Sequence, residues 1–406
     1  MQVITLPAKG HYFIFAGTLI TGDGTPARHD MLLHIDSGMI KNIHSLPPPD
    51  TKAESGTNEN HRKKNSFLDC SNLTIMPGLI DCHVHLALDG IDSEKAMQNW
   101  KDPNEIQRQM ITRLKNTLAN GILTVRDGGD SAGINLLFSK KVQKGEITGP
   151  RIIATGNALR KKNMYGSFLG ENTGANPAEA VSRLAAAGAR QIKVLVSGIV
   201  SFKEYGRVGP IHFSQEELKT IVEEAHSLGL TVMAHANSDQ AVTMAASAGV
   251  DSLEHGYFIS RDSLKMLAEL NIPWVPTLIP VAAWSLKPGV RNINPEHRKI
   301  AERTYRQHQA MIAEASAMGI TLGVGTDSGA LGVQHGDGYL KELELYREAG
   351  LSTAEILQAA TANGARIVGL EQGAGLVLPG SPANLIAVAG NFLKDLKIGV
   401  RLAILR

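Results

Sequence analysis

The feature that most constrains the fold is a repeated alternation of short apolar segments with amphipathic stretches, which begins after Asp69 and fills most of the chain. Each apolar segment is rich in Val, Ile and Leu and ends in glycine or polar residues. These segments are Met76–Leu86, Leu123–Asp127, Arg151–Gly156, Gln191–Gly198, Thr231–His235, Asp251–Gly256, Trp274–Leu278 and Thr321–Asp327. Eight strands that alternate with helices predict an α/β fold, a parallel (β/α)8 barrel of the TIM type.

The amphipathic stretches are predicted to be helices. Ser214 followed by Glu217 is typical of a capping box at a helix start, and Gly188 and Gly249 suit helix C-termini. The predicted helices are Asn104–Asn120, Leu136–Gly145, Pro177–Gly188, Ser214–Gly229, Asp239–Gly249, Asp262–Leu270, Pro295–Met318 and Ser352–Leu370.

The two ends of the chain carry short apolar runs separated by glycine, which predict small strands. These runs are Tyr12–Ala16, Met31–Ile35, Met39–Ile43, Asn384–Val388 and Leu402–Leu405. We expect them to pair into one small β-sandwich domain built from residues 1–76 and 371–406, with residues 77–370 forming the barrel domain. Residues 46–66 are rich in Pro, Lys, Asn and Glu and predict a loop.

The composition excludes several classes of function. A net charge of +2 is near neutral and gives no basis for nucleic-acid binding. The two cysteines, Cys70 and Cys82, imply no disulfide framework. The first residues lack a signal-peptide pattern, and no apolar run approaches the ~20 residues of a membrane span. We therefore expect a cytoplasmic protein that acts on a small molecule, without a nucleic-acid or membrane partner. Whether the protein forms a homo-oligomer stays an open question.

The first apolar segment ends in His83 and His85, which share one face of a strand because residues two apart point the same way. Buried imidazoles need partners for their nitrogens, which the backbone or a divalent metal ion can provide. Later segments end in further ligand-type residues, namely His235, His255 and Asp327. Around one barrel mouth, this set could hold one ion or a pair about 3.5–4 Å apart. The histidines expected to be ordinary are His11, His34, His44, His61, His212, His226, His297 and His308.

Lys193 lies inside an apolar segment, between Ile192 and Val194, where its charge is expensive unless it is paired. One interpretation is a snorkelling or salt-bridged lysine. The other is a neutral amine that carbon dioxide has carboxylated, so that the resulting carbamate bridges two metal ions.

Taken together, these motifs resemble the amidohydrolase superfamily of metal-dependent hydrolases over nearly the whole chain. Within it, the sequence is most similar to the branch of imidazolonepropionase-like and Xaa-Pro dipeptidase-like enzymes. The segments that carry the resemblance are residues 77–85, 124–127, 192–194, 235–236, 253–256, 325–329, 334–336, 359–363 and 376–383.

The resemblance implies a binuclear centre of zinc, or of another divalent ion such as manganese, with a carboxylated lysine. It implies that His83, His85 and Asp327 hold the buried ion, that His235 and His255 hold the exposed ion, and that Lys193 bridges them. The implied reaction is hydrolysis of an amide C–N bond in a peptide-like, N-acyl amino acid or cyclic amide substrate. A metal-activated hydroxide attacks the carbonyl, and Asp327 passes its proton to the leaving nitrogen.

The sequence departs from this branch in two places. Gly156 leads into Asn157 instead of a Thr-Gly-Gly-His type segment, and Asn237 stands where a second histidine often follows the fifth strand. Both changes put the substrate in question more than the metal. A Glu shortly after His235, which deaminase branches use for proton transfer, is missing, and this argues against a nucleobase deaminase.

Four loop residues are candidates for substrate binding, and for each a structural role is the competing interpretation. They are Tyr205, Arg207, Arg160 and His335. Two alternatives to a binuclear enzyme stay open. The first is a mononuclear imidazolonepropionase-like hydrolase with unmodified Lys193, and the second is a non-catalytic binding protein on the same barrel.

Overall fold

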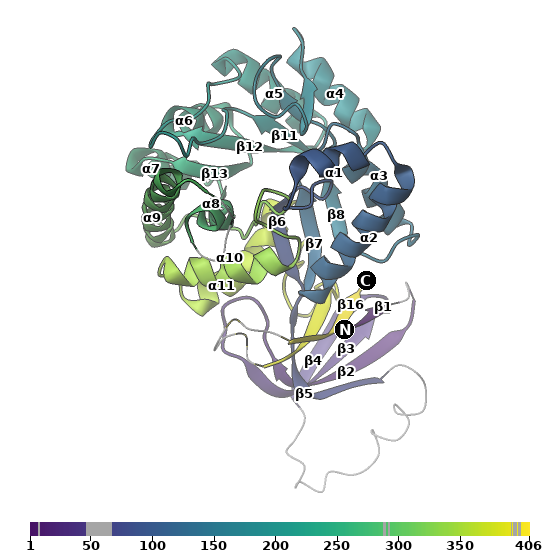
Figure 1. Ribbon diagram of the computed structural model, residues 1–406. Coiled ribbons are helices and arrows are strands. Elements are labelled where there is room, and N and C mark those ends of the chain that lie inside the picture. The colour runs from purple at the N-terminus through teal and green to yellow at the C-terminus, as the bar shows by residue number, and fades with distance from the viewer. Residues whose placement is uncertain are drawn as a thin grey trace, which may run out of the picture.

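The computed structural model describes residues 1–6, 9–45, 67–286, 290, 293–390, 392, 396 and 399–406. The chain forms a large part, in which helices surround strands, and a smaller β-sheet part, in which the two ends of the chain lie side by side (Figure 1). The loop predicted for residues 46–66 lies outside the described residues.

The smaller part is one seven-stranded sheet in the order β1-β16-β15-β5-β2-β3-β4. Its strands are β1 (Gln2–Thr5), β2 (His11–Leu19), β3 (Arg28–Asp36), β4 (Met39–Ser45), β5 (Phe67–Pro77), β15 (Leu385–Ala389) and β16 (Gly399–Leu405). Both chain ends contribute because β15 pairs antiparallel with β5 and with β16. Alternate residues of β3, such as Leu33 and Ile35, are buried in its own apolar core.

The strands from both ends join edge to edge through β5 and β15, and this makes one continuous hydrogen-bonded sheet. The small domain from both chain ends is thus present, and its layering as a β-sandwich stays a prediction. The boundaries predicted for the two domains stay a prediction.

The larger part contains two parallel sheets. The three-stranded sheet has the order β6-β7-β8, and the six-stranded sheet has the order β10-β9-β11-β12-β13-β14. Their strands are β6 (Leu79–Val84), β7 (Ile122–Asp127), β8 (Arg151–Ala154), β9 (Ala158–Arg160), β10 (Gly170–Asn172), β11 (Gln191–Leu195), β12 (Thr231–Ser238), β13 (Ser252–Phe258) and β14 (Trp274–Val275).

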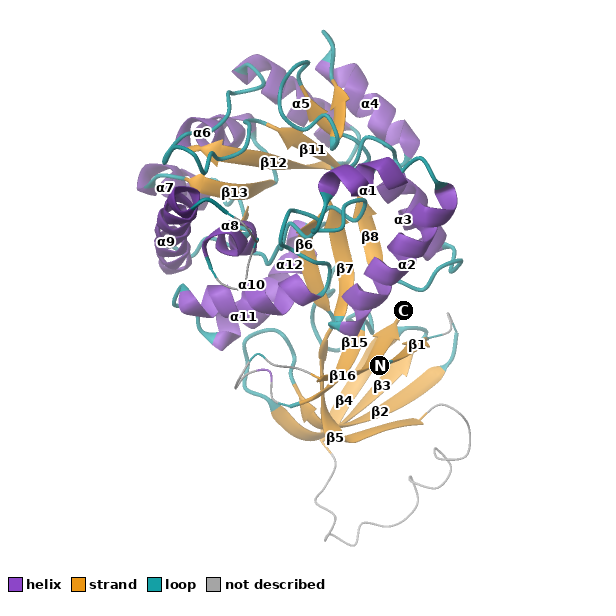
Figure 2. Ribbon diagram, viewed as in Figure 1, coloured by secondary structure: helices purple, strands orange, loops and turns teal. Residues whose placement is uncertain are grey.

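Helices lie outside these strands (Figure 2). They are α1 (Ser93–Asn99), α2 (Pro103–Ala119), α3 (Ile134–Gln143), α4 (Pro177–Ala187), α5 (Gln215–Ser227), α6 (Asp239–Ala248), α7 (Arg261–Glu269), α8 (Leu278–Ser285), α9 (Pro295–Ala317), α10 (Asp337–Glu348), α11 (Thr353–Ala360) and α12 (Ala362–Ile367). The predicted capping box is confirmed, because Ser214 and Glu217 bond each other's backbone at the start of α5. Gly188 and Gly249 end α4 and α6 in the left-handed conformation.

The closed eight-stranded barrel is only partly confirmed. Among the described residues, β8 does not pair with the six-stranded sheet. The eighth predicted segment, residues 321–327, is not a regular strand. It is held by separate backbone hydrogen bonds, from Cys82 N to Val324 O at 2.8 Å and from Trp274 N to Thr321 O at 2.9 Å. A side chain at Gly325 would lie 2.4 Å from Val275, so the segment passes its neighbours too closely for a residue with a Cβ. The left-handed backbone of Asp327, with φ of 53°, ends the extended conformation.

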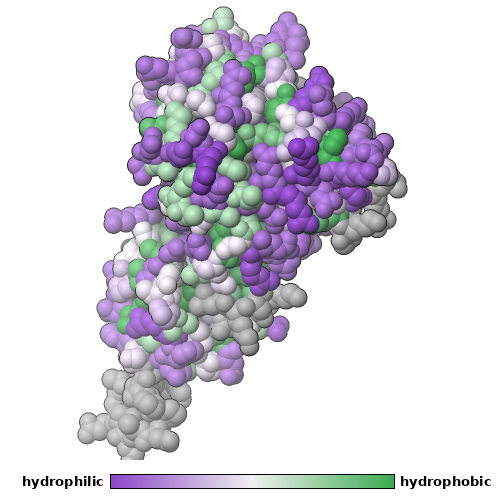
Figure 3. All heavy atoms as spheres, turned by 90° about the vertical axis from the view of Figure 1, so that its left-hand side faces the viewer, coloured by the Kyte–Doolittle hydropathy of each residue, from purple (hydrophilic) through white to green (hydrophobic). Residues whose placement is uncertain are grey.

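The main apolar core fills the space between the strands and the surrounding helices. It includes Leu114, Phe138 and Leu218 from the helices and Trp274 from β14. The face drawn in Figure 3 is mostly hydrophilic, with hydrophobic residues in small separate areas. Among the described residues, no helix combines the length and the apolarity needed to cross a lipid bilayer.

Candidate metal centre

The six predicted ligands come together at the C-terminal ends of the parallel strands. Two lie on or just after β6, one lies on each of β11, β12 and β13, and one ends the eighth segment. They are His83, His85, Lys193, His235, His255 and Asp327. All are buried except Asp327, whose side chain is 17% exposed.

His83, His85 and Asp327 form the tightest group. Asp327 Oδ1 lies 3.3 Å from His85 Nε2 and 3.7 Å from His83 Nε2. One ligand atom of each residue lies within 4.8 Å of the others. Atoms bound at about 2.0–2.2 Å to a tetrahedral zinc ion are separated by about 3.3–3.6 Å, so this spacing suits a single ion.

Lys193 lies against the same group. Its Nζ is 3.3 Å from His83 Nε2, and the residue is only 1% exposed. Burial lowers the pKa of this amine to about 8, although the carboxylates of Glu254 and Asp327 raise it. The neutral amine is therefore accessible at ordinary pH.

His255 connects this group to His235. The ring centroid of His255 lies 4.8 Å from that of His83 and 4.5 Å from that of His235. The predicted ligands His235 and His255 therefore lie directly beside the first group, through the ring contact of His255 with His83.

Each of the four histidines has one ring nitrogen tied to the protein. Nδ1 of His83 lies 2.8 Å from Glu254 Oε2, and Nδ1 of His255 lies 2.8 Å from Thr277 Oγ1. Nδ1 of His85 lies 3.2 Å from a backbone carbonyl, and Nε2 of His235 lies 3.4 Å from another. A metal-binding imidazole uses one nitrogen for the ion and the other for such a partner, so the arrangement suits a metal centre.

The electrostatics also favour a metal. Burial, followed by neighbouring positive charge, lowers the pKa of His83, His235 and His255 well below the ordinary value, so these rings are neutral. Burial also lowers the pKa of His85, but the hydrogen bond and charge of Asp327 outweigh it and raise the net value. Neutral imidazole is the form that binds a metal ion.

A buried ionic network contacts His83 on the Nδ1 side of its ring. Glu254 Oε1 lies 2.6 Å from Arg126 Nη2 and accepts a hydrogen bond from Ser252 at 2.7 Å. Arg126 also donates to Gln191. These roles were not predicted, although charged residues inside apolar segments were the sequence signal that could have revealed them.

Two buried carboxylates hold the backbone around the ligands. Asp81 accepts hydrogen bonds from the backbone and hydroxyl of Thr326, at 3.0 and 2.6 Å, and burial raises its pKa to about 7. Asp127 accepts from the backbone of Leu86 at 2.8 Å and of Gly129 at 2.9 Å. These bonds join the end of β6 to its neighbours on both sides.

Three residues of the site have a strained backbone. His255, Thr277 and Asp327 have φ values of 66°, 50° and 53°, which residues with side chains rarely adopt. Strain of this kind persists where the surrounding structure imposes it, and it is common at functional sites.

Two of the predicted substrate residues lie in the loop after β11. The hydroxyl of Tyr205 donates to Gln307, and the guanidinium of Arg303 lies 3.6 Å from the centre of the Tyr205 ring. Arg207 is 70% exposed and pairs with Glu204 at 2.8 Å. Tyr205 also makes an edge-to-face ring contact with Phe258 at the end of β13, with centroids 5.6 Å apart. A role of either residue in substrate binding stays a prediction.

The other two also have structural partners. Arg160 donates to the carbonyls of Gly170 and Met164, at 3.3 and 3.4 Å. His335 Nε2 lies 2.9 Å from Leu88 O and lines a cavity beside α2. In the described part of the chain, neither forms a hydrogen bond or ion pair with a predicted metal ligand.

Other residues near His235 were not predicted. The ring of Tyr165 stacks on the ring of His235 at 5.8 Å, and Asn237 Nδ2 lies 2.9 Å from His235 Nε2. His212, which was expected to be ordinary, is buried close enough to help lower the pKa of His235. Sequence pattern gave no signal for His212, because the loop after β11 folds back to place it there.

A sequence profile of the amidohydrolase family matches residues 74–402. The chain belongs to the amidohydrolase family. This amidohydrolase is 28% identical to ochratoxinase of Aspergillus niger, over 95% of its own length and 82% of that protein. It is also similar to a solved structure of a Xaa-Pro dipeptidase with bound methionine in the active site, with a TM-score of 0.80, 25% identity and coverage of 95% and 96% of the two chains.

The solved structure of A. niger ochratoxinase is similar to the same extent, with a TM-score of 0.80, 25% identity and coverage of 98% of this chain and 94% of that one. The predicted family and the predicted hydrolysis of amide C–N bonds with a divalent metal are confirmed. The structural neighbours also support the predicted architecture of a barrel with a small additional domain.

Proposed function

We propose that this amidohydrolase cleaves the amide bond of a small N-acyl amino acid, dipeptide or cyclic amide at a binuclear zinc centre, on a (β/α)8 barrel. The observation that carries the binuclear proposal is the position of Lys193. Its buried Nζ lies 3.3 Å from His83 Nε2, and His83 is in ring contact with His255 of the second ligand pair.

The donor set fits zinc. Imidazole nitrogens and a carboxylate are ligands that zinc favours, and manganese is the other divalent ion that we consider. His83, His85 and Asp327 would hold one ion, and His235 and His255 would hold the other. When bound, such ions bring the pKa of a coordinated water towards neutrality and polarise a substrate carbonyl.

Lys193 is suited to carboxylation. Its neutral amine can form a bond to the carbon of carbon dioxide and release one proton, which leaves an anionic carbamate. The carbamate would supply an oxygen ligand to both ions and so connect the group of His83, His85 and Asp327 with the pair of His235 and His255. The low exposure of Lys193 and the absence of an ion pair for it in the described part of the chain support this reading.

Asp327 is positioned to move the proton. It is the most exposed of the six residues, while its Oδ1 remains 3.3 Å from His85 Nε2. Its carboxylate can therefore accept a proton from the attacking water and pass it to the nitrogen that leaves as the C–N bond breaks.

The substrate class is supported by the relatives. Ochratoxinase is an amide hydrolase, and the similar dipeptidase structure holds methionine in its active site. The dipeptidase structure favours a substrate whose cleavage releases an amino acid.

Replacement of Asp327 tests this function. We expect Asp327→Asn to retain its metal content and to lower kcat by about 10²–10⁴-fold, because the proton carrier is lost. The assay is turnover of a panel of N-acyl amino acids, dipeptides and cyclic amides by zinc-loaded or manganese-loaded protein, with metal measured by mass spectrometry. Asp337→Asn, at the start of α10, is the matched control. Near-normal turnover by the Asp327 variant would rule out the proposed role.

A mononuclear hydrolase with unmodified Lys193 is the second candidate, and the compactness of the group of His83, His85 and Asp327 favours it. Metal counting separates the two. Two equivalents per chain, with reconstitution that depends on bicarbonate, support the binuclear centre. One equivalent, with no bicarbonate dependence, supports the mononuclear one.

A further inference from the structure

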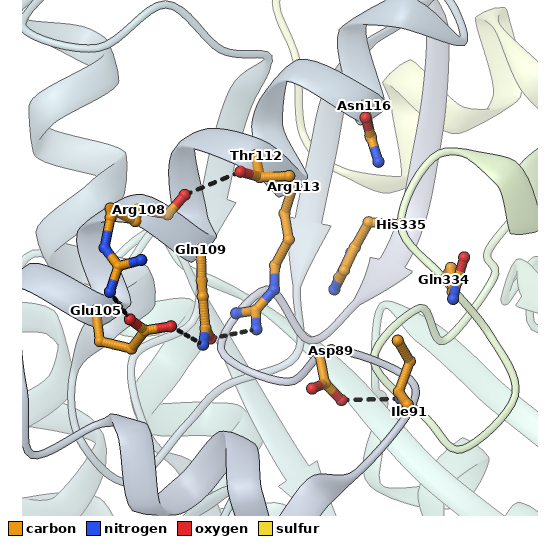
Figure 4. Close-up of a pocket in the computed structure, with 10 residues that line it drawn as sticks. All are labelled: Asp89, Ile91, Glu105, Arg108, Gln109, Thr112, Arg113, Asn116, Gln334 and His335. Carbon is orange, nitrogen blue, oxygen red and sulfur yellow. Dashed lines mark hydrogen bonds and ion pairs between the residues drawn. The ribbon is translucent and has the colours of Figure 1, made fainter.

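A cavity of about 410 Å³ lies outside the metal centre, between α2 and the loops that follow β6 and the eighth segment. Polar and charged side chains line it (Figure 4). They include Asp89, Glu105, Arg108, Arg113, Asn116 and His335. None of these is a predicted metal ligand.

Arg113 is the central group of this cavity. The residue is 7% exposed, and its guanidinium donates to Leu86 O and to Gln109 Oε1, both at 2.8 Å. Both acceptors are neutral, and among the described residues no carboxylate forms an ion pair with Arg113. A guanidinium has five N–H groups, and buried charges are normally paired, so part of its binding capacity faces the cavity unused.

A negative group with a free oxygen faces the same space. Asp89 Oδ1 accepts from the backbone of Ile91 and Asp92, at 2.8 and 2.9 Å, while its Oδ2 has no partner in the described part of the chain. Figure 4 shows the Asp89 carboxylate, the Arg113 guanidinium and the His335 ring directed towards one another. Glu105 is different, because Arg108 and Gln109 already occupy its oxygens.

We propose that this cavity is a second binding site, for a free α-amino acid, with the ligand carboxylate on Arg113 and the ligand ammonium on Asp89. A guanidinium binds a carboxylate through two parallel hydrogen bonds. The nearby carboxylate of Asp89 offers a partner for a cation at the other end, so a zwitterion satisfies both groups where a simple anion satisfies one.

The site is joined to the metal centre through the backbone. Arg113 holds the carbonyl of Leu86, the residue that follows His85, and His335 holds the carbonyl of Leu88. If the proposed function is right, the amino acid bound here is also a product of the reaction. The choice of ligand does not depend on that function, because it rests on the charges of Arg113 and Asp89.

The test is calorimetric titration of the metal-loaded protein with a panel of free L-amino acids, with acetate, methylamine and inorganic phosphate as singly functional comparisons. We expect amino acids to bind more tightly than any of the three comparisons. Arg113→Gln should weaken amino-acid binding by about tenfold or more, because hydrogen bonds to a charged partner are lost.

A second variant guards against misfolding of the first. Thr112 is an exposed residue of α2 that lines the cavity, so Thr112→Trp should fill the space and abolish binding. Lys115→Trp, on the same helix but outside the lining, should bind as the unmodified protein does. Unchanged affinity in both cavity variants would overturn the proposal, because binding would then be elsewhere, as at the metal centre. Equal affinity for acetate or phosphate would overturn the amino-acid assignment. If the unmodified metal-loaded protein binds amino acids but does not hydrolyse amides, only the proposed function is refuted.

Discussion

Replacement of Glu254 by glutamine probes the network below the metal centre. The carboxylate has two tasks, because Oε2 faces His83 Nδ1 at 2.8 Å and Oε1 faces Arg126 Nη2 at 2.6 Å. Glutamine has one oxygen and one NH₂ group. In either orientation the NH₂ group meets a donor, from the imidazole or from the guanidinium.

The size of the effect follows from burial. Glu254 and Arg126 have side chains that are 0% and 1% exposed, so the change leaves a buried cation without its counter-charge. Removing one partner of such a pair costs about 3–5 kcal/mol. Arg126 keeps its bonds to Ser252, Gln191 and the carbonyl of Cys82, which places the expected loss of unfolding free energy near the lower end, about 3 kcal/mol.

The assay separates the two tasks. Denaturant unfolding gives the loss of stability, and metal competition gives the affinity, which we expect to fall about 10–100-fold because His83 loses its orienting partner. The double variant Glu254→Gln, Arg126→Met removes the uncompensated cation, so it should regain most of the stability but not the metal affinity. Equal recovery of both, or Glu254→Gln with unchanged metal affinity, would refute the reasoning.

Three further predictions concern the centre and its surroundings. Thr277→Val removes the hydroxyl beside His255 Nδ1 and should weaken metal binding about 10–100-fold. Thr277→Ser keeps the hydroxyl and should leave the affinity unchanged. Equal metal affinities of the two variants in a competition assay would contradict this prediction. Burial lowers the pKa of His308 from 6.5 to about 4. Between these two pH values the unfolded chain binds more protons than the folded chain, so the free energy of unfolding falls as the pH drops from 6.5 to about 4. Between about pH 7.5 and about pH 5 this amounts to about 2 kcal/mol, and denaturant unfolding of His308→Gln at the two pH values should show a correspondingly smaller drop. Chelation of the metal should lower the melting temperature by several degrees, and re-addition of zinc should restore it, since an ion that binds only the folded chain stabilises it.

Much of the larger part of the fold follows from the sequence because local patterns encode it. The period of apolar residues and the caps placed the helices, and the capping box of Ser214 and Glu217 forms as predicted. The eighth segment was misjudged because its apolar residues alternate with glycines, and Gly323 and Gly325 allow close contact in place of a regular ladder. The pairing of the small domain could not be predicted, because register between distant strands such as β5 and β15 is not visible locally.

The candidate ligands could be grouped from the sequence for a related reason. His83, His85, Lys193, His235, His255 and Asp327 each follow or interrupt an apolar strand, and parallel strands end at one edge, so chain order alone brings them together. The sequence thereby determined the family, the chemistry and the candidate ligands.

Tertiary structure decided what lies around them. The pairing of Glu254 with Arg126, the position of His212 and the cavity that surrounds Arg113 depend on side chains from segments far apart in the chain. A local pattern records which face a residue occupies, but contacts between distant side chains depend on how helices and loops pack, and that packing exists only in the folded chain.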